Sequence, residues 1–76
     1  MGKVYVKHTE LNDIHLMEPQ GDGYTVKTLR HDGYWSSGTY YEDESFEEMY
    51  RQIKSNPFQL VSESLESLKV LVELTQ

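Results

Sequence analysis

The chain has 76 residues, a formal net charge of −6 and no cysteine. This length accommodates one domain, and a sequence without cysteine excludes disulfides and thiolate metal sites. An acidic protein repels the phosphates of duplex DNA and anionic membranes, so we expect neither as a partner. No stretch of the sequence approaches the about 20 apolar residues of a membrane-spanning helix, and we expect a cytoplasmic protein.

The first half of the chain has the period-2 alternation that is typical of β-strands. Val4 and Val6 alternate with charged and aromatic residues, and later segments are rich in β-branched and aromatic side chains. Asp32-Gly33 predicts a hairpin turn before the last strand, and Gly38 indicates a bulge or a close backbone approach within that strand. The four predicted strands span about residues 3–8, 14–18, 24–29 and 34–41.

The apolar spacing changes at Ser45 to the helical period of 3.6. Ser45 and Glu48 match a capping box, in which each side chain accepts a hydrogen bond from the other residue's backbone N–H. The residue before Pro57 is disfavoured in a helix, so the first predicted helix spans about residues 45–55. Its apolar stripe consists of Phe46, Met49, Tyr50 and Ile53.

The last segment has two interpretations, because residues 69–72 could form a strand. We prefer a helix over about residues 57–74, since Asn56 is a good N-cap and Pro57 suits the first helical position. The apolar residues that recur at helical spacing are Phe58, Val61, Leu65, Leu68 and Val72. The sequence thus predicts an α+β fold: a four-stranded antiparallel sheet followed by two helices packed on one face.

Three further leucines widen the apolar face of the second predicted helix to about 200°. These residues are Leu60, Leu71 and Leu74. Two explanations remain open. Either the helix is sandwiched between the sheet and the first helix, or the leucines contact a second copy of the chain in a homodimer.

Catalytic and metal-binding motifs are missing from the sequence. The three histidines, His8, His15 and His31, lack the spacing of zinc ligands, so we expect neither a metal nor a cofactor. The sequence contains no nucleophile elbow and no phosphate-binding glycine loop, and a domain of this size has little room for a deep pocket. We therefore expect a protein that is not an enzyme.

Five acidic residues fall within seven positions: Glu42, Asp43, Glu44, Glu47 and Glu48. One explanation is a solvated helix start, because the dipole and the free N–H groups of a helix N-terminus stabilise carboxylates. The other explanation is a partner-binding surface, because five carboxylates exceed that need and repel one another. Residues 42–76 hold eight acids against three bases, so the negative charge is concentrated in this half.

Aromatic residues are concentrated on the fourth predicted strand, where neighbours alternate between the two faces of a sheet. This alternation places Trp35 and Tyr41 on one face, opposite Tyr34 and Tyr40. Together with Tyr5, Trp35 and Tyr41 form a candidate aromatic binding surface. Such a surface suits a protein-binding hot spot or a platform for RNA or single-stranded bases, whereas cross-strand packing explains it without a partner.

The predicted plan, the small size, the acidic second half and the junction "GTYYEDESFEEMYRQI" together resemble the small phage-encoded inhibitors of bacterial defence. These are the anti-CRISPR and anti-restriction proteins. The resemblance implies a non-enzymatic inhibitor that acts in the host cell as a mimic of DNA. Its acidic and aromatic surface would block the basic nucleic-acid-binding surface of a host protein such as a CRISPR effector or a nuclease.

A second resemblance is to antitoxins of the HicB type, in "DGYTVKTL" followed by "SGTYYEDESFEEMYRQI". The chain lacks the proline and the Gly-Cys segment that are usual between those strands. This resemblance implies a protein that neutralises a partner toxin. An RNA or single-strand binder that uses the open sheet face is a further alternative.

Overall fold

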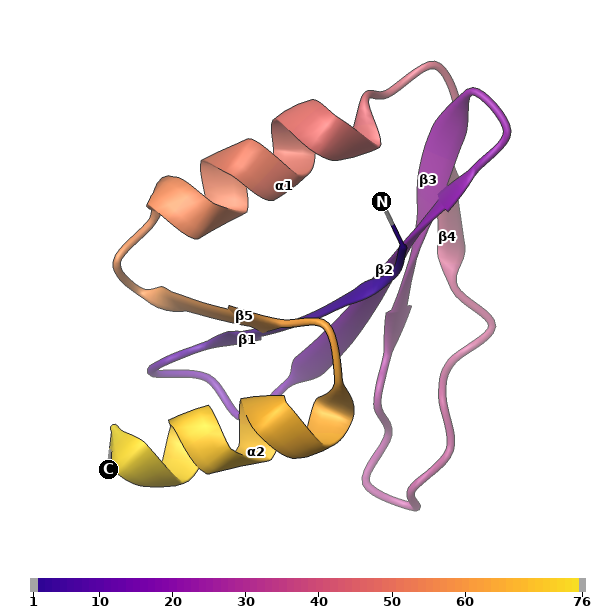
Figure 1. Cartoon of the computed structure of the whole chain (residues 1–76). Helices are drawn as coiled ribbons and strands as arrows, with labels where there is room; N and C mark the ends of the chain where they lie inside the picture. The colour runs from indigo at the N-terminus through magenta and orange to yellow at the C-terminus, as the bar shows by residue number, and fades with distance from the viewer. Residues whose placement is uncertain (1, 76) are drawn as a thin grey trace.

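Five antiparallel strands and two helices make up the structure, a computed structural model that describes residues 2–75 (Figure 1). The strand order is β4-β3-β2-β1-β5, so the last strand pairs with the first. The predicted α+β class and antiparallel sheet are confirmed, but the sheet has five strands rather than four. The elements are β1 (Val4–His8), β2 (Ile14–Gln20), β3 (Gly23–Thr28), β4 (Thr39–Tyr41), α1 (Phe46–Ser55), β5 (Gln59–Ser62) and α2 (Leu65–Leu74).

The first three strands form a meander close to the predicted one. β1 pairs with β2 so that Val4 lies opposite Met17, and β2 pairs with β3 so that Met17 lies opposite Val26. Because residues that lie opposite each other point to the same face of a sheet, Val4, Met17 and Val26 share one face, and α1 covers that face. The main core therefore consists of Val4, Val6, Met17, Tyr24 and Phe46.

Helix α1 begins and ends close to the predicted positions. Ser45 is its N-cap, and the Ser45 hydroxyl accepts a hydrogen bond from Glu48 N–H at 3.2 Å. Among the described residues, the capping box lacks its return bond from Ser45 N–H to the Glu48 carboxylate. Phe46 is buried, and Met49 and Ile53 pack against the main core, which confirms the predicted apolar stripe.

The fourth strand is much shorter than predicted, because β4 holds three residues. Earlier in the segment, Trp35 makes an isolated bridge with Leu29. Gly38 has a φ of +89°, and a Cβ at this position would lie 2.8 Å from Cγ of Lys27. The predicted close approach at Gly38 is therefore confirmed, but it interrupts the alternation of side chains that the sequence predicted for the whole segment.

The helix predicted over about residues 57–74 is wrong in its first part, where residues 59–62 form β5. Val61 of this strand packs against the main core beneath α1, so its neighbour Leu60 faces the other side. A strand that is covered on both faces has adjacent apolar residues and shows no alternation. For this reason the spacing of Phe58 and Val61 was compatible with a helix.

The cap predicted for the second helix is also corrected. The Asn56 side chain accepts a hydrogen bond from Phe58 N–H at 2.9 Å, which stabilises a turn before β5. Ser64 is the N-cap of α2 and accepts a hydrogen bond from Ser67 N–H at 3.1 Å. No helix within residues 2–75 is both long and apolar enough to cross a membrane.

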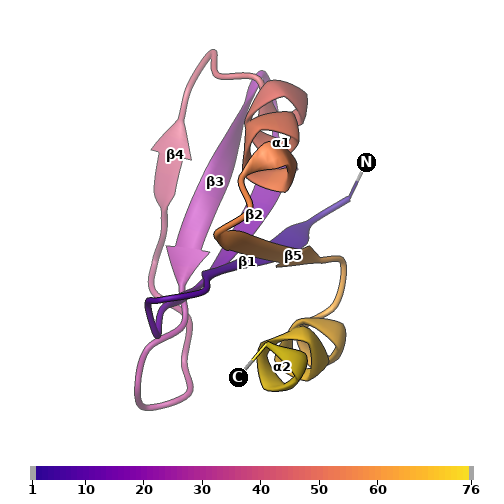
Figure 2. The same ribbon diagram turned by 90° about the vertical axis from the view of Figure 1, so that its left-hand side faces the viewer.

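The two helices lie on opposite sides of β1 and β5, as both views show (Figure 1, Figure 2). Helix α2 contacts these two strands, and its Leu68 is fully buried. Leu16 is buried as well, and it points away from the face of its neighbour Met17. The prediction of two helices on one face is therefore wrong, because the chain crosses the sheet edge after β5.

Candidate functional site

Acidic side chains from separate parts of the chain gather at one end of the β3–β4 pair. Tyr24 lies opposite Tyr41, so the β2–β3 turn at Asp22 lies beside the β4–α1 connection at Asp43 (Figure 1). Gly23 permits this approach, because a Cβ on it would lie 2.0 Å from the Tyr41 carbonyl oxygen. We call this surface the acidic tip. It consists of Asp22, Glu42, Asp43, Glu44, Glu47 and Glu48, all of them exposed.

Three carboxylates of the acidic tip lie very close together. Asp22, Glu42 and Asp43 each place one carboxylate oxygen within 4.8 Å of the others. Asp43 has a φ of +59°, a conformation that Asp and Asn adopt more readily than most other residues. These oxygens could contact a hard cation such as Ca²⁺, to which they would supply three of its about six to eight ligands.

A tyrosine hydroxyl orders this part of the tip. Tyr40 Oη donates a hydrogen bond of 2.7 Å to Asp22 Oδ1. The bond lowers the pKa of Asp22 below its ordinary value and raises the pKa of Tyr40 to about 12, because it stabilises the carboxylate and the neutral phenol. Asp22 therefore keeps its negative charge well into the acidic range.

The structure separates the acidic residues into two groups. Glu47 and Glu48 lie in the first turn of α1, where the helix dipole and free N–H groups stabilise carboxylates. The three acids of residues 42–44 precede the N-cap Ser45 and lie outside the helix. A solvated helix start thus accounts for Glu47 and Glu48, whereas the other three predicted residues and Asp22 lie outside the helix.

The tip carboxylates make no ion pair within the part of the chain that the structure describes. The ion pair of that part, between Arg30 and Asp32 at 2.8 Å, lies in the connection from β3 to β4. Lys54 of α1 lies over the Tyr50 ring, with Nζ 5.3 Å from the ring centroid. The negative charge of the acidic tip is therefore available to solvent or to a partner.

A shallow hollow of about 250 Å³ opens within the acidic tip. Asp22, Glu44 and Glu47 line it together with the N-cap Ser45. Burial raises the pKa of the neighbouring Tyr24, and the negative charge of Glu44 adds to this increase. The acidic lining suits one long basic side chain of a partner, because carboxylates form strong hydrogen bonds with ammonium and guanidinium groups.

The predicted aromatic surface is divided between two places. Tyr41 stacks on the buried Tyr24, with 5.2 Å between ring centroids, and adjoins the acidic tip. Tyr5 and Trp35 lie together on the opposite face of the sheet, 5.9 Å apart. The structure therefore does not bring Tyr41 to the other two, since the irregular segment before β4 shifts the alternation. Tyr40 and Tyr41, 46% and 42% exposed, are the aromatic neighbours of the tip.

Sequence reasoning missed Asp22 and Tyr40 as members of this site. The sequence Gly-Asp-Gly at residues 21–23 indicates a turn, but it does not say which segment lies beside that turn. The pairing of β3 with β4 supplies this information. A regular hairpin that turns at Asp32-Gly33 would pair β3 and β4 in a different register, because the segment before β4 is irregular. Such a register does not predict that Asp22 lies beside the β4–α1 connection.

The leucines predicted for self-association lie in different environments. Leu60 and Leu71 are half-buried, the first on β5 and the second on α2. Leu74 is 76% exposed, and Val70, four residues earlier on the same side of α2, is 53% exposed. Contact with a second copy of the chain stays a prediction, and Leu74 with Val70 is the surface on which it now depends.

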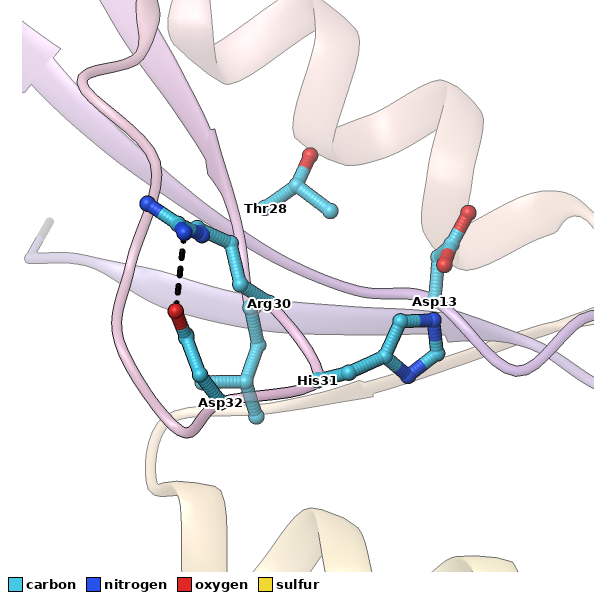
Figure 3. A pocket seen from close by; sticks show the side chains of 6 residues that line it. Asp13, Thr28, Arg30, His31 and Asp32 are labelled. Atoms are coloured by element: carbon cyan, nitrogen blue, oxygen red, sulfur yellow. Dashed lines mark ion pairs between the residues drawn. The ribbon is translucent and has the colours of Figure 1, made fainter.

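Another hollow, of about 440 Å³, lies where the β1–β2 connection meets the β3–β4 connection (Figure 3). Its lining combines charged and polar side chains, with the Arg30–Asp32 ion pair at its edge. The residues around it are Asp13, Thr28, Leu29, Arg30, His31 and Asp32. The Arg30 guanidinium is paired with Asp32, and Asp13 adds a second carboxylate to the lining, so this hollow is open to solvent and offers no unpaired positive charge to an anion.

The histidines do not converge. His8 stacks on Phe58 with 6.1 Å between ring centroids, and His15 Nδ1 lies 3.0 Å from Thr28 Oγ1. His31 lines the hollow of Figure 3. The three histidines therefore lie in three separate surroundings.

Comparisons with known proteins leave the site to be interpreted from its own geometry. No family model matches the chain, no curated protein matches its sequence, and no solved structure matches its fold. The fold and the acidic tip define a small α+β protein with a charged, partly aromatic surface at one end of an antiparallel sheet.

Proposed function

We propose that the protein is a non-enzymatic inhibitor that binds another protein through its acidic tip. The partner is a basic nucleic-acid-binding protein, such as a CRISPR effector or a nuclease, in the cytoplasm of a bacterial host that a phage infects. The tip occupies the surface that would otherwise bind phosphates. The observation that carries the proposal is the close set of Asp22, Glu42 and Asp43, none of which forms an ion pair within residues 2–75.

The charge density of the tip supports this proposal. Three carboxylate oxygens within 4.8 Å of one another concentrate negative charge on a small area, as the phosphates of a nucleic acid do. A basic groove attracts such a surface from a distance, which increases the rate of association. The hollow between Asp22 and Glu44 gives one basic side chain of the partner a place to bind.

The tyrosines beside the tip supply contact area that charge alone lacks. Tyr40 and Tyr41 are both about half-exposed, and tyrosine is enriched among the residues that contribute most to protein–protein affinity. The hydrogen bond from Tyr40 also fixes the Asp22 carboxylate before a partner binds. A fixed group loses less conformational entropy on binding, so this bond favours affinity.

A toxin is the second candidate partner. β4 runs into α1 through an acidic junction, which is the feature that carries the resemblance to HicB-type antitoxins. An antitoxin would use the same acidic tip to cover the RNA-binding surface of a toxin. The two candidates differ in the partner and not in the surface, so one experiment separates them.

The test is a panel of purified CRISPR effectors, restriction nucleases and toxin ribonucleases, each assayed for cleavage while the protein is titrated. We expect one-to-one inhibition of a panel member that weakens as salt is raised. The combined change Glu42→Lys, Glu44→Lys, Glu47→Lys and Glu48→Lys should weaken binding by at least about 100-fold, because it replaces attraction by repulsion at several interface charges.

A matched control reverses four exposed acids outside the tip and so changes the net charge equally. These residues are Glu10, Glu63, Glu66 and Glu73. This control should change affinity by less than about tenfold, since charges beyond a Debye length are largely screened. Inhibition that survives the reversal at the tip, or that falls equally in the control, would contradict the proposal.

A further inference from the structure

The sheet face opposite the main core carries a pair of aromatic rings. The rings of Tyr5 and Trp35 are tilted by 44°, with 5.9 Å between their centroids. Both residues are half-buried, and neither belongs to the core beneath α1. The single tryptophan of the chain therefore lies at the surface, where its large flat ring can stack on a ligand.

Lysines surround this aromatic pair on the same face. Lys3 and Lys7 stand two residues before and after Tyr5, and the Nζ atom of Lys3 lies 6.0 Å from the Tyr5 ring centroid. Tyr5 lies opposite Leu16, which in turn lies opposite Lys27, so these residues form one row across the sheet. We call this surface the lysine–aromatic platform. It consists of Lys3, Tyr5, Lys7, Lys27 and Trp35.

A hollow of about 450 Å³ adjoins the platform on β2 and β3. Lys27 lines this hollow and also belongs to the platform, so the two are continuous. Glu18, Thr25 and Ser37 supply further polar groups to the lining. Ligand sites commonly have volumes of about 300–1,000 Å³, and this hollow is within the range that suits one nucleotide.

We propose that the lysine–aromatic platform binds single-stranded RNA. A base stacks on Trp35 and Tyr5, and the lysine ammonium groups contact the flanking phosphates. The next nucleotide enters the hollow, where the Thr25 hydroxyl and the Glu18 carboxylate bond its ribose 2′-OH. This group both donates and accepts hydrogen bonds, so the lining favours RNA over DNA.

The local charge of the platform agrees with this ligand. Lys3, Lys7 and Lys27 share this face with Glu18, and the Lys7 ammonium also donates a hydrogen bond of 3.1 Å to the His8 carbonyl oxygen. The platform residues thus carry positive charge on a protein whose net charge is −6. RNA would be attracted by the platform and repelled by the acidic tip. This binding goes beyond the proposed function and does not depend on it, because the acidic tip and the lysine–aromatic platform consist of different residues, although the hollows beside them both have Pro19 in their lining.

Trp35 is a built-in probe for the test, because it is the only tryptophan in the sequence. A uridine-rich RNA of about ten nucleotides should quench its fluorescence saturably at low salt. The logarithm of affinity should fall against the logarithm of salt concentration with a slope of about −2, as expected for three lysine–phosphate contacts to a single strand. Lys27→Gln should reduce this slope by about 0.7.

Variants of the aromatic pair are compared by the anisotropy of labelled RNA. Trp35→Ala should lower affinity about 5- to 150-fold, the range for loss of one stacked base. Trp35→Phe keeps an aromatic ring and should retain most of the affinity, which keeps the test decisive if the alanine variant fails to fold. Tyr34→Ala is the matched control, because Tyr34 is 73% exposed in the same connection and lies outside the platform.

Three results would overturn the proposal. The first is the absence of saturable quenching up to about 1 mM RNA, because a dissociation constant above that concentration would be weaker than that of ordinary non-specific binding. The second is DNA of the same sequence, or an acidic peptide, binding as tightly as RNA. The third is an equal loss of affinity in Tyr34→Ala and Trp35→Ala. The charge reversal at the acidic tip should leave RNA affinity unchanged or higher, so this proposal and the inhibitor proposal fail separately.

Discussion

The acidic tip and the lysine–aromatic platform differ in charge and in the way the chain builds them. Five of the six tip residues are close in sequence, and one turn adds Asp22. The platform instead takes residues from β1, from β3 and from the connection before β4. The acidic tip therefore depends mostly on the order of residues in the sequence, whereas the platform depends on the pairing of strands, which brings distant residues to one face.

The comparison also shows how little the net charge says about a surface. The net charge of −6 predicts repulsion from nucleic acid, and much of the negative charge is concentrated at the tip. Screening by salt limits such repulsion to about 10 Å, so the three lysines of the platform dominate their own surroundings. One small sheet can thus offer an acidic end to a basic protein and a cationic face to an anion.

The largest expected change in stability concerns helix α2, which packs on the side of the sheet that carries the platform. Leu68→Ala should lower the free energy of unfolding by about 3 kcal/mol, because Leu68 is fully buried and its loss leaves a cavity beneath α2. Urea denaturation measures this change. Val70→Ala on the same helix is the control and should stay within about 1 kcal/mol of the original, since Val70 is 53% exposed. Equal effects of the two changes would show that α2 does not pack on the sheet as described.

The next largest change in stability concerns the acidic tip. Gly23→Ala should lower the free energy of unfolding by about 2 kcal/mol, because the new Cβ would lie 2.0 Å from the Tyr41 carbonyl oxygen and must force β4 away. NMR chemical shifts should change at Asp22 and Asp43 and much less at Trp35. Gly2→Ala, where a Cβ meets no atom within 4 Å, should change neither. Shifts that change equally at Trp35 would mean that the two surfaces are not independent.

The smallest expected effect concerns a single hydrogen bond within the tip. In an alkaline titration of absorbance, one tyrosine should ionise near pH 12, and this step should be missing in Tyr40→Phe. Because the folded pKa of Tyr40 is above its ordinary value of 10.0, the bond stabilises the fold fully below that value. The stabilisation is lost as the pH rises through 12.

The hydrogen bond between Tyr40 and Asp22 also affects stability at acidic pH. There the stabilisation is lost as the pH falls, and not as it rises. The pKa of Asp22 is lowered, so its contribution to stability is present above the ordinary carboxyl range and is lost as the pH falls through the folded value. In Tyr40→Phe the pKa of Asp22, measured by NMR titration, should rise. A pKa of Asp22 that stays the same would show that the hydrogen bond is not formed in solution.

Sequence patterns were most informative where one face of an element is buried and the other is exposed. Alternation in the first strands and the helical stripe of Phe46, Met49, Tyr50 and Ile53 satisfied this condition, and these elements were predicted closely. The condition fails for β5, which has α1 on one side and α2 on the other (Figure 2). Its adjacent apolar residues therefore continued the helical spacing of the next segment and concealed the fifth strand.

The candidate site was predictable to the extent that its charge is local. The five acids of residues 42–48 were found from composition alone, and the structure leaves all of them exposed. Regular alternation predicts Tyr41 on the face of Trp35, but the backbone has a positive φ at Gly38, and the structure places Tyr41 beside the tip. The irregular segment before β4, which includes Gly38, thus places Trp35 and Tyr41 on opposite faces of the sheet.

The most direct test of the central claim measures the stability of the isolated protein after neutralising the acids that lie before α1. If Glu42, Asp43 and Glu44 carry more negative charge than the fold can use, then Glu42→Gln, Asp43→Asn and Glu44→Gln together should raise the thermal midpoint at low salt, and the gain should shrink as salt is added. The matching change of Glu63, Glu66 and Glu73 to Gln is the control and should give a smaller increase. A lower midpoint in the first variant would contradict the account, because it would show that these carboxylates serve the fold and not a partner.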